Sequence, residues 1–99
     1  MYCITFIYGF AIFICSYPVL ECPQDCFRKG KRTDGHILDV ATINNVKDVC
    51  KCQRHCQESK KCTYFDYDET SANCYLREGQ LDEDALVDDS KVTVGLRTC

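Results

Sequence analysis

The cysteines are the residues whose type and spacing most directly suggest chemistry in this chain. Cys50, Cys52, Cys56 and Cys62 crowd together, with His55 among them. Such residues can hold zinc, but zinc sequences usually show two separated ligand pairs, such as CxxC and HxxxH. Here the spacing is CxC, then three residues, then five, and CxxC does not occur. We therefore expect no metal site, and disulfide formation is the other chemistry open to these thiols.

The amino-terminal residues indicate an oxidising destination. Residues 2–15 read YCITFIYGFAIFIC, an apolar run without charge, and Pro18 stops any helix soon afterwards. This is typical of a secretory signal peptide, although no Lys or Arg precedes the run. We predict that residues 1–16 are a leader, cleaved near Ser16–Tyr17. The alternative is an uncleaved anchor, but the run is shorter than the roughly 20 apolar residues of a membrane span.

Removal of the leader leaves 83 residues, 17–99, which is room for one domain. Of the ten cysteines, Cys3 and Cys15 leave with the leader and eight remain. An even number in a short secreted chain predicts a disulfide framework, because so small a domain buries too little apolar surface to be stable without cross-links. We expect residues 17–25 to form an amino-terminal arm.

Other groups that could support catalysis or cofactor binding lack the necessary context. The two histidines, His36 and His55, have no acid–base partner in a recognisable motif, so we expect no enzyme. The carboxylates near the carboxyl terminus do not follow the ligand order of a calcium loop, and we expect a solvated acidic loop without a cofactor. These carboxylates are Asp82, Glu83, Asp84, Asp88 and Asp89.

A basic cluster is the candidate ligand-binding feature. Its members, named the basic cluster below, are Arg28, Lys29, Lys31 and Arg32. Four cations in five positions could hold the sulfate or carboxylate groups of a glycosaminoglycan or of a protein, and the alternative is an ordinary soluble face. Charge is also segregated along the chain, with a net +5 over residues 26–61 and −6 over 62–99.

The elements that must position these residues are one helix and several strands. Asn44-Asn45, followed by good helix formers, predicts a helix that fades near Ser59. The strands are predicted from β-branched and aromatic residues at 36–40, 62–68, 73–77 and 92–96, and the acidic stretch 79–91 is read as a surface loop. The second and third strands should form a hairpin. Its aromatic residues are Tyr64, Phe65, Tyr67 and Tyr75, and alternation sends Phe65 and Tyr67 to one face and Tyr64 to the other. We expect an α+β domain in which one helix packs across an antiparallel sheet.

The predicted helix sorts its cysteines by direction. Cys52 and Cys56 lie one turn apart on one face, which Val49 shares, whereas Cys50 points elsewhere. Cys52 and Cys56 should not bond each other, because Cβ atoms one turn apart are separated by about 5–6 Å, against about 3.8 Å in a disulfide.

This framework resembles the PAN/apple domain family over residues 26–99. The resemblance begins at Cys26 with CFRKG and TDGHILDV, and continues through CQRHC at 52–56 and CTYFDYD at 62–68. CYLR at 74–77 is similar to the family's Cys-x-Leu-Lys, and VGLRTC is similar to its closing Ser-Gly-x-x-Cys, with Val94 in place of Ser.

The resemblance implies a disulfide pairing and a function. The family's nested pattern would pair Cys26 with Cys99, Cys52 with Cys74, and Cys56 with Cys62. Cys22 and Cys50 depart from the six-cysteine pattern, and the resemblance leaves them to bond each other.

PAN and apple domains are non-catalytic adhesion modules, so the resemblance implies an extracellular binding protein. Its partner would be a protein or a carbohydrate, such as a sulfated glycosaminoglycan; we expect no nucleic acid and no membrane span after leader cleavage. The alternatives are a small secreted enzyme, which would need an acid–base pair in a cleft, and a protease inhibitor. The inhibitor would need a rigid exposed loop, for which residues 82–91 are the candidate.

Overall fold

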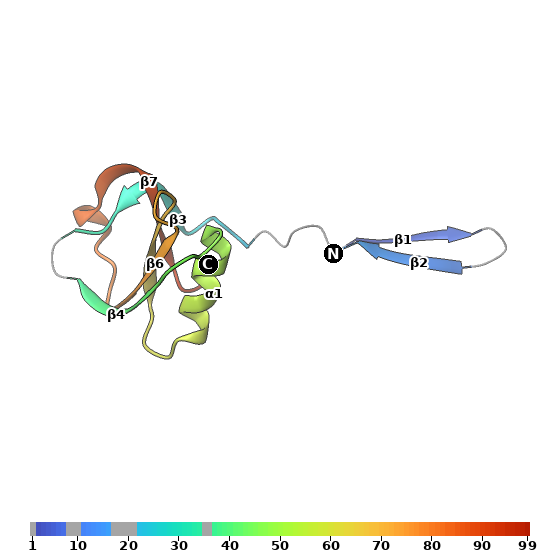
Figure 1. The fold of residues 1–99 in the computed structure, drawn as a ribbon, viewed down its shortest axis with the longest axis horizontal. Helices are drawn as coiled ribbons and strands as arrows, with labels where there is room; N and C mark the ends of the chain where they lie inside the picture. Colours follow the sequence, from blue (N-terminus) through green and yellow to red (C-terminus); the bar gives the residue numbers. More distant parts are fainter. Residues whose placement is uncertain (1, 8–10, 17–21, 35–36) are drawn as a thin grey trace.

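Five antiparallel strands and one helix make up the chain after residue 21 (Figure 1). The computed structural model describes residues 2–7, 11–16, 22–34 and 37–99. The elements of this part are β3 (Phe27–Arg32), β4 (Leu38–Ile43), α1 (Val49–Glu58), β5 (Tyr64–Asp68), β6 (Asn73–Glu78), the 3-10 turn η1 (Glu83–Ala85) and β7 (Val87–Leu96). The strand order is β3-β7-β5-β6-β4. The predicted α+β class is confirmed.

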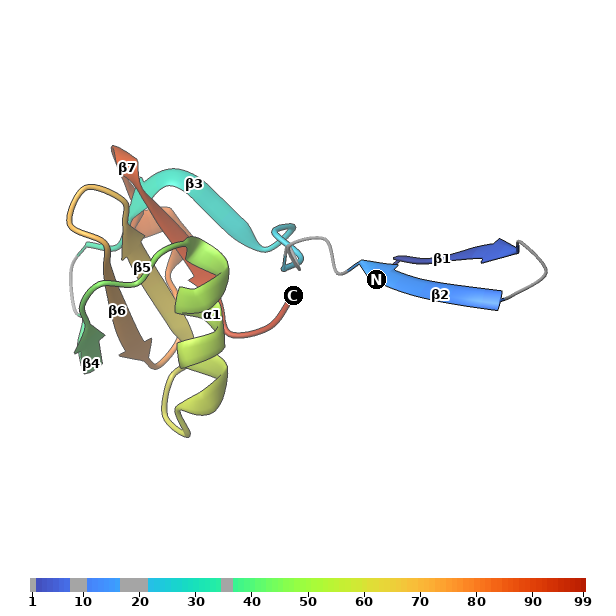
Figure 2. The same cartoon turned by 45° about the vertical axis from the view of Figure 1, so that its right-hand side comes forward.

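The sheet lies between two layers. Helix α1 packs against β5, β6 and β7 on one face (Figures 1 and 2). The segment that joins β6 to β7, which contains η1, runs on the other side of the sheet (Figure 1). The sheet is therefore covered on both faces, which explains why four consecutive residues of β5, 64–67, are all buried.

Helix α1 begins later than the sequence predicts. Its N-cap is Asp48, whose carboxylate accepts a hydrogen bond of 2.8 Å from the Lys51 amide. Asn45 instead adopts φ of 60°, and the next amide, of Val46, donates to the Ala72 carbonyl. Asp and Asn are about equally good caps, so local preference does not decide between positions 45 and 48. The prediction of an Asn cap was wrong because the hydrogen bond from Val46 to Ala72 holds residues 45 and 46 outside the helix.

The other end of α1 is held by a residue that the sequence analysis did not single out. The Arg97 guanidinium donates to the carbonyls of Gln57, Ser59 and Cys62, at 2.7, 2.6 and 2.9 Å. A cation at the carboxyl end of a helix also opposes the helix dipole favourably. Arg97 therefore joins the end of the chain to the end of the helix.

A strand is observed in each of the four predicted regions, but other strand residues were not predicted. The predicted hairpin is confirmed, with Tyr67 opposite Cys74. The strand expected at 36–40 is observed at Leu38–Ile43, and His36 lies outside the described residues. Strand β3 was not predicted, and β7 begins at Val87, inside the stretch read as a loop. Both gain strand structure by pairing with each other, a long-range contact.

Gly30 marks an irregularity in β3 that orients its side chains. The register with β7 shifts between Lys29 and Lys31, and Gly30 has φ of +74°. Glycine adopts this left-handed conformation without the steric penalty of a Cβ, and it is typical of a β-bulge. Before the bulge Lys29 is opposite Thr93, and after it Lys31 is opposite Asp88.

The core lies between α1 and the sheet and is rich in cysteine. It contains the fully buried Cys52, Cys56, Cys62 and Cys74 around Phe65. Phe65 meets Phe27 edge to face, with ring centroids 5.5 Å apart. As predicted, Phe65 and Tyr67 share this core face.

The apolar run at the amino terminus forms two antiparallel strands, β1 (Tyr2–Ile7) and β2 (Ala11–Ser16). The predicted cleavage point includes Tyr17, which lies outside the described residues. Cleavage of a leader at this point stays a prediction. No helix in the described ranges has the length and apolar character needed to cross a membrane.

Candidate binding site

Four disulfides hold the residues of the site in place. They are Cys22–Cys50, Cys26–Cys99, Cys52–Cys74 and Cys56–Cys62, the same pairs that the family resemblance implies. Cys52 and Cys56 lie on the buried face of α1. Cys52 bonds to Cys74 on β6, and Cys56 bonds to Cys62, two residues before β5. Cys50 bonds instead to the amino-terminal arm. The helix is thereby attached to the sheet by two covalent links and to the arm by a third.

The basic cluster lies along β3, where three of its four members form ion pairs. Arg28 Nη2 is 2.7 Å from Glu83 Oε1, Lys31 pairs with Asp88, and Arg32 Nε is 3.7 Å from Asp89 Oδ2. Each carboxylate comes from η1 or the start of β7. Two segments of opposite charge, far apart in the sequence, therefore neutralise each other.

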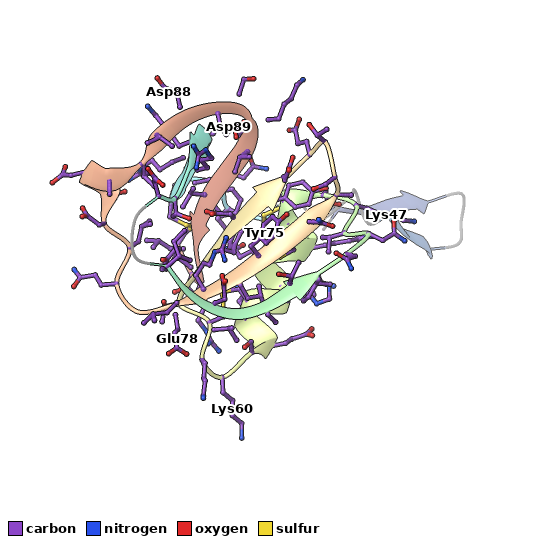
Figure 3. The ribbon with its side chains drawn as sticks, turned by 60° about the vertical axis from the view of Figure 1, so that its left-hand side comes forward. Lys47, Lys60, Tyr75, Glu78, Asp88 and Asp89 are labelled. Atoms are coloured by element: carbon purple, nitrogen blue, oxygen red, sulfur yellow. A yellow bond between two sulfur atoms is a disulfide. The ribbon has the colours of Figure 1, made fainter. Side chains whose placement is uncertain are left out.

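This pairing changes the electrostatics of both segments. The ammonium of Lys31 lowers the pKa of Asp88, mainly through their hydrogen bond. The acidic residues at 82–89 are thus partly neutralised by ion pairs. Asp88 and Asp89 lie at the edge of the molecule (Figure 3). Within the described residues, Lys29 is the member of the basic cluster that forms no ion pair.

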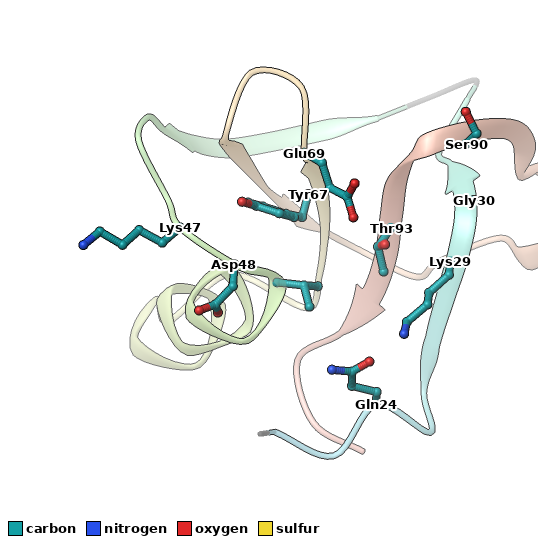
Figure 4. A pocket seen from close by; sticks show the side chains of 10 residues that line it. Gln24, Lys29, Gly30, Lys47, Asp48, Tyr67, Glu69, Ser90 and Thr93 are labelled. Carbon is teal, nitrogen blue, oxygen red and sulfur yellow. The ribbon is translucent and has the colours of Figure 1, made fainter. Parts of the chain in front are cut away.

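Lys29 instead lines a cavity between β3, β7 and the amino-terminal end of α1. The cavity has a volume of about 470 Å³. Its lining residues come from separate parts of the chain: Gln24, Lys29, Gly30, Lys47, Asp48, Val49, Tyr67, Glu69, Ser90 and Thr93. Figure 4 shows Lys29 and Gln24 pointing into the space between β3 and the helix, whereas the Lys47 side chain extends away from it.

The cavity wall alternates hydrogen-bond donors and acceptors. Lys29 offers an ammonium, Asp48 and Glu69 offer carboxylates, and hydroxyl groups of Ser90 and Thr93 can do either. Tyr67 contributes its ring, while its hydroxyl donates to the Val46 carbonyl at 2.6 Å. Burial raises the pKa of Tyr67, and Asp48 and Glu69 add to this effect, so the phenol remains a donor. The wall can therefore both donate and accept hydrogen bonds.

A second polar group, buried on the sheet face away from α1, was not foreseen. The Thr33 hydroxyl donates to Asp66 Oδ2, and Arg77 Nη2 lies 3.6 Å from the same oxygen. Arg77 also pairs with Asp39 and lies over the Tyr75 ring, 5.1 Å from its centroid. Burial raises the pKa of Asp66 although the Thr33 hydrogen bond lowers it. In the described part of the chain, Asp66 Oδ1 has no hydrogen-bond partner.

The remaining candidates of the sequence analysis do not join the cavity. His55 is half-buried on the last turn of α1, and His36 lies outside the described residues. Across the described ranges, no three His, Cys, Asp or Glu side chains converge in a way that could hold a metal ion.

Of the cavity residues, sequence reasoning proposed only Lys29 as a ligand contact. The others lie in the arm, on β3, before and at the start of α1, in and just after β5, and on β7, and no spacing along the chain links them. The alternation along β5 gave one usable signal, since it placed Tyr67 on the same face as Phe65.

Comparison with known proteins places these features in a family. The model of the PAN domain matches residues 21–99. Two curated proteins of Sarcocystis muris, a major microneme antigen and a microneme antigen, are each 32% identical to this chain over 54 residues. The matched segment covers 54% of this chain and 22% of either relative, so the chain corresponds to a small part of those proteins.

Proposed function

Because the chain belongs to the PAN domain family, we propose that it is a secreted, non-catalytic adhesion module whose cavity binds a saccharide. Four disulfides and a predicted leader support secretion, since such bonds persist in oxidising compartments. The similarity to proteins named microneme antigens is consistent with a role at a cell surface. The family shares a scaffold and varies its surfaces, so the ligand is argued from the cavity itself.

The composition of the cavity is the observation that carries this proposal. A volume of about 470 Å³ is within the range of small-molecule sites. Such sites are usually lined mainly by apolar side chains. Here Val49 and the Tyr67 ring are the apolar elements, and Lys29, Asp48 and Glu69 bring charges of both signs. Sugar hydroxyls donate and accept hydrogen bonds, so they match a wall that offers both.

A protein ligand fits the described surface less well. Protein interfaces depend on clusters of large apolar and aromatic side chains. Among the described residues, the exposed large apolar side chains are Leu38 and Leu96, which lie on β4 and at the end of β7, two strands that are not neighbours in the sheet. A single module binds a sugar weakly unless several copies are linked. The assay should therefore present the protein in a multivalent form.

A glycan array tests the proposal. The full chain is expressed through a secretory pathway, biotinylated and tetramerised on streptavidin, then applied beside the variants Lys29→Gln and Glu69→Gln. We expect the wild-type protein to bind a restricted set of glycans and each variant to lose most of that signal, because each removes one hydrogen-bonding charge from the wall.

Lys91→Gln is the matched control, since it removes one exposed cation that does not line the cavity. It should bind as the wild type does. An absence of glycan binding, or equal losses in the control and the cavity variants, would refute the saccharide proposal.

A further inference from the structure

The solvent-facing side of α1 and its flanking residues carry a group of cations. Buried Cys52 and Cys56 define the side of the helix that faces the sheet. At 100° per residue, positions 51 and 54 of the helix lie away from that side. They hold Lys51 and Arg54, while Lys47 precedes the Asp48 cap and Lys60 and Lys61 follow the helix. We name these five residues the helix cations.

The helix cations differ from the basic cluster in lacking partners. All five are exposed. The ion pairs found among the described residues involve Arg28, Lys31, Arg32 and Arg77, and none of the five. The nearby carboxylates are Asp48, which is engaged as the helix cap, and Glu58. Residues 47–61 therefore carry a net +3, in a chain whose overall charge is −3.

The position of Lys51 is unfavourable for the helix itself. The amino-terminal end of a helix carries a partial positive charge, which attracts anions and repels cations. Yet Lys51 lies in the first turn, which contains no acidic residue, although the Asp48 carboxylate caps the helix. Lys51 therefore adds positive charge at the positive end of the helix dipole, and an anion bound there would relieve this repulsion.

We propose that the helix cations bind a linear sulfated polysaccharide. Lys51 and Arg54 are three residues apart, which is about 4.5 Å along the helix axis. Lys47 precedes the helix, and Lys60 and Lys61 follow its carboxyl end. Lys47 and Lys60 extend into solvent near the two ends of the helix (Figure 3). A row of separated cations matches an extended chain with repeated anionic groups.

An anionic membrane is a poorer match for this face. A helix that binds a membrane surface presents an apolar side to the lipid and cations beside it. The apolar side of α1 consists of Cys52 and Cys56, and both are fully buried against the sheet. The helix cations can therefore contact an anionic polymer in solution but have no apolar neighbours to insert into lipid.

This inference moves the polyanion site from β3 to α1 and is independent of the saccharide cavity. Three members of the basic cluster already have carboxylate partners, which a polyanion would have to displace. Of the helix cations, only Lys47 borders the cavity, and its side chain extends away from it (Figure 4). A test that leaves Lys47 unchanged therefore separates the two proposals.

Heparin chromatography of two charge-matched triple variants tests the inference. Lys51→Gln/Arg54→Gln/Lys60→Gln removes three helix cations, and Arg28→Gln/Lys31→Gln/Arg32→Gln removes three from the basic cluster. Both change the net charge equally. We expect the wild-type protein to be retained at low salt and released as salt screens the contacts. The helix variant should elute much earlier than the basic-cluster variant, with a salt dependence of log affinity reduced by roughly two to three.

Four outcomes would overturn the inference. The wild-type protein could pass through heparin at low salt, or the two variants could weaken equally, which would indicate net charge alone. Retention could also fall more in the basic-cluster variant. Binding to phosphatidylserine vesicles but not to heparin would assign the face to a membrane instead. Circular dichroism and thermal melting check that both variants keep the fold.

Discussion

Two of the disulfides close loops of similar length in very different surroundings, and this contrast allows a sharp test of the fold. Cys22–Cys50 spans 28 residues and Cys52–Cys74 spans 22. Cys22 on the arm and Cys50 on α1 are half-buried, whereas Cys52 and Cys74 are fully buried in the core. The perturbation is to replace both members of one pair by serine, in two separate variants.

Chain entropy alone predicts nearly equal destabilisation. For these loop lengths, loss of the cross-link lowers the free energy of unfolding by about 3.6 kcal/mol for Cys22–Cys50 and about 3.4 kcal/mol for Cys52–Cys74. The core variant also leaves two hydroxyl groups buried without partners, at about 1–3 kcal/mol each. We therefore expect Cys52→Ser/Cys74→Ser to be less stable than Cys22→Ser/Cys50→Ser by about 2–6 kcal/mol.

Thermal denaturation of the two refolded variants measures this difference. For a domain of this size, 1 kcal/mol corresponds to about 4–8 °C, so the midpoints should differ by roughly 8 °C or more. Thiol alkylation and mass spectrometry verify that the other three disulfides have formed in each. We also expect the arm variant to be secreted and the core variant to be retained. Equal midpoints, or a lower midpoint for the arm variant, would refute the assignment of Cys52–Cys74 to the structural core.

Two further predictions concern single residues. Because burial raises the pKa of Asp66, its contribution to stability is present at low pH and lost as pH rises through the folded-state value. The difference in melting midpoint, wild type minus Asp66→Asn, should thus increase as pH falls. A pH series of melts in which this difference decreases as pH falls would contradict the prediction. A Cβ at Gly95 would lie 2.8 Å from Phe27 Cδ1 and closer still to the Phe65 ring. Gly95→Ala should therefore lose about 1–3 kcal/mol in chemical denaturation through overpacking, and an unchanged unfolding midpoint would show that the two rings can move aside.

The sequence predicts those parts of the fold that depend on local pattern. The hairpin of β5 and β6 follows from alternating aromatic and polar residues around a turn, and its two faces were assigned correctly. The direction of Cys52 and Cys56 follows from helical periodicity, which places them toward the sheet. Strand β3 was missed because its sequence, FRKGKR, has four cations and a glycine. Such residues form a strand only when a partner supplies hydrogen bonds and opposite charge.

The candidate sites show the same division between local and long-range information. A search along the chain finds clusters of like charge, so it found Arg28 to Arg32 and could not see that Glu83, Asp88 and Asp89 lie beside them. It likewise could not assemble the cavity, whose lining residues range from Gln24 to Thr93. The helix cations are spread over 47–61, and the placing of Lys51 and Arg54 on the exposed side of α1 depends on where the helix starts.

The family resemblance supplied the disulfide pairing. The sequence by itself determined that the cysteines are cross-linked, how the hairpin residues alternate and the class of the domain. These properties depend on residue type and on spacing within one element, and the helical and strand periods convert spacing into direction. The tertiary structure decided which charges are neutralised and which remain free to bind. Coulomb attraction acts between side chains that are close in space, and the antiparallel pairing of β3 with β7 brings residues 28–32 to the carboxylates at 83–89. These three carboxylates therefore face the cations of β3 and not those of α1.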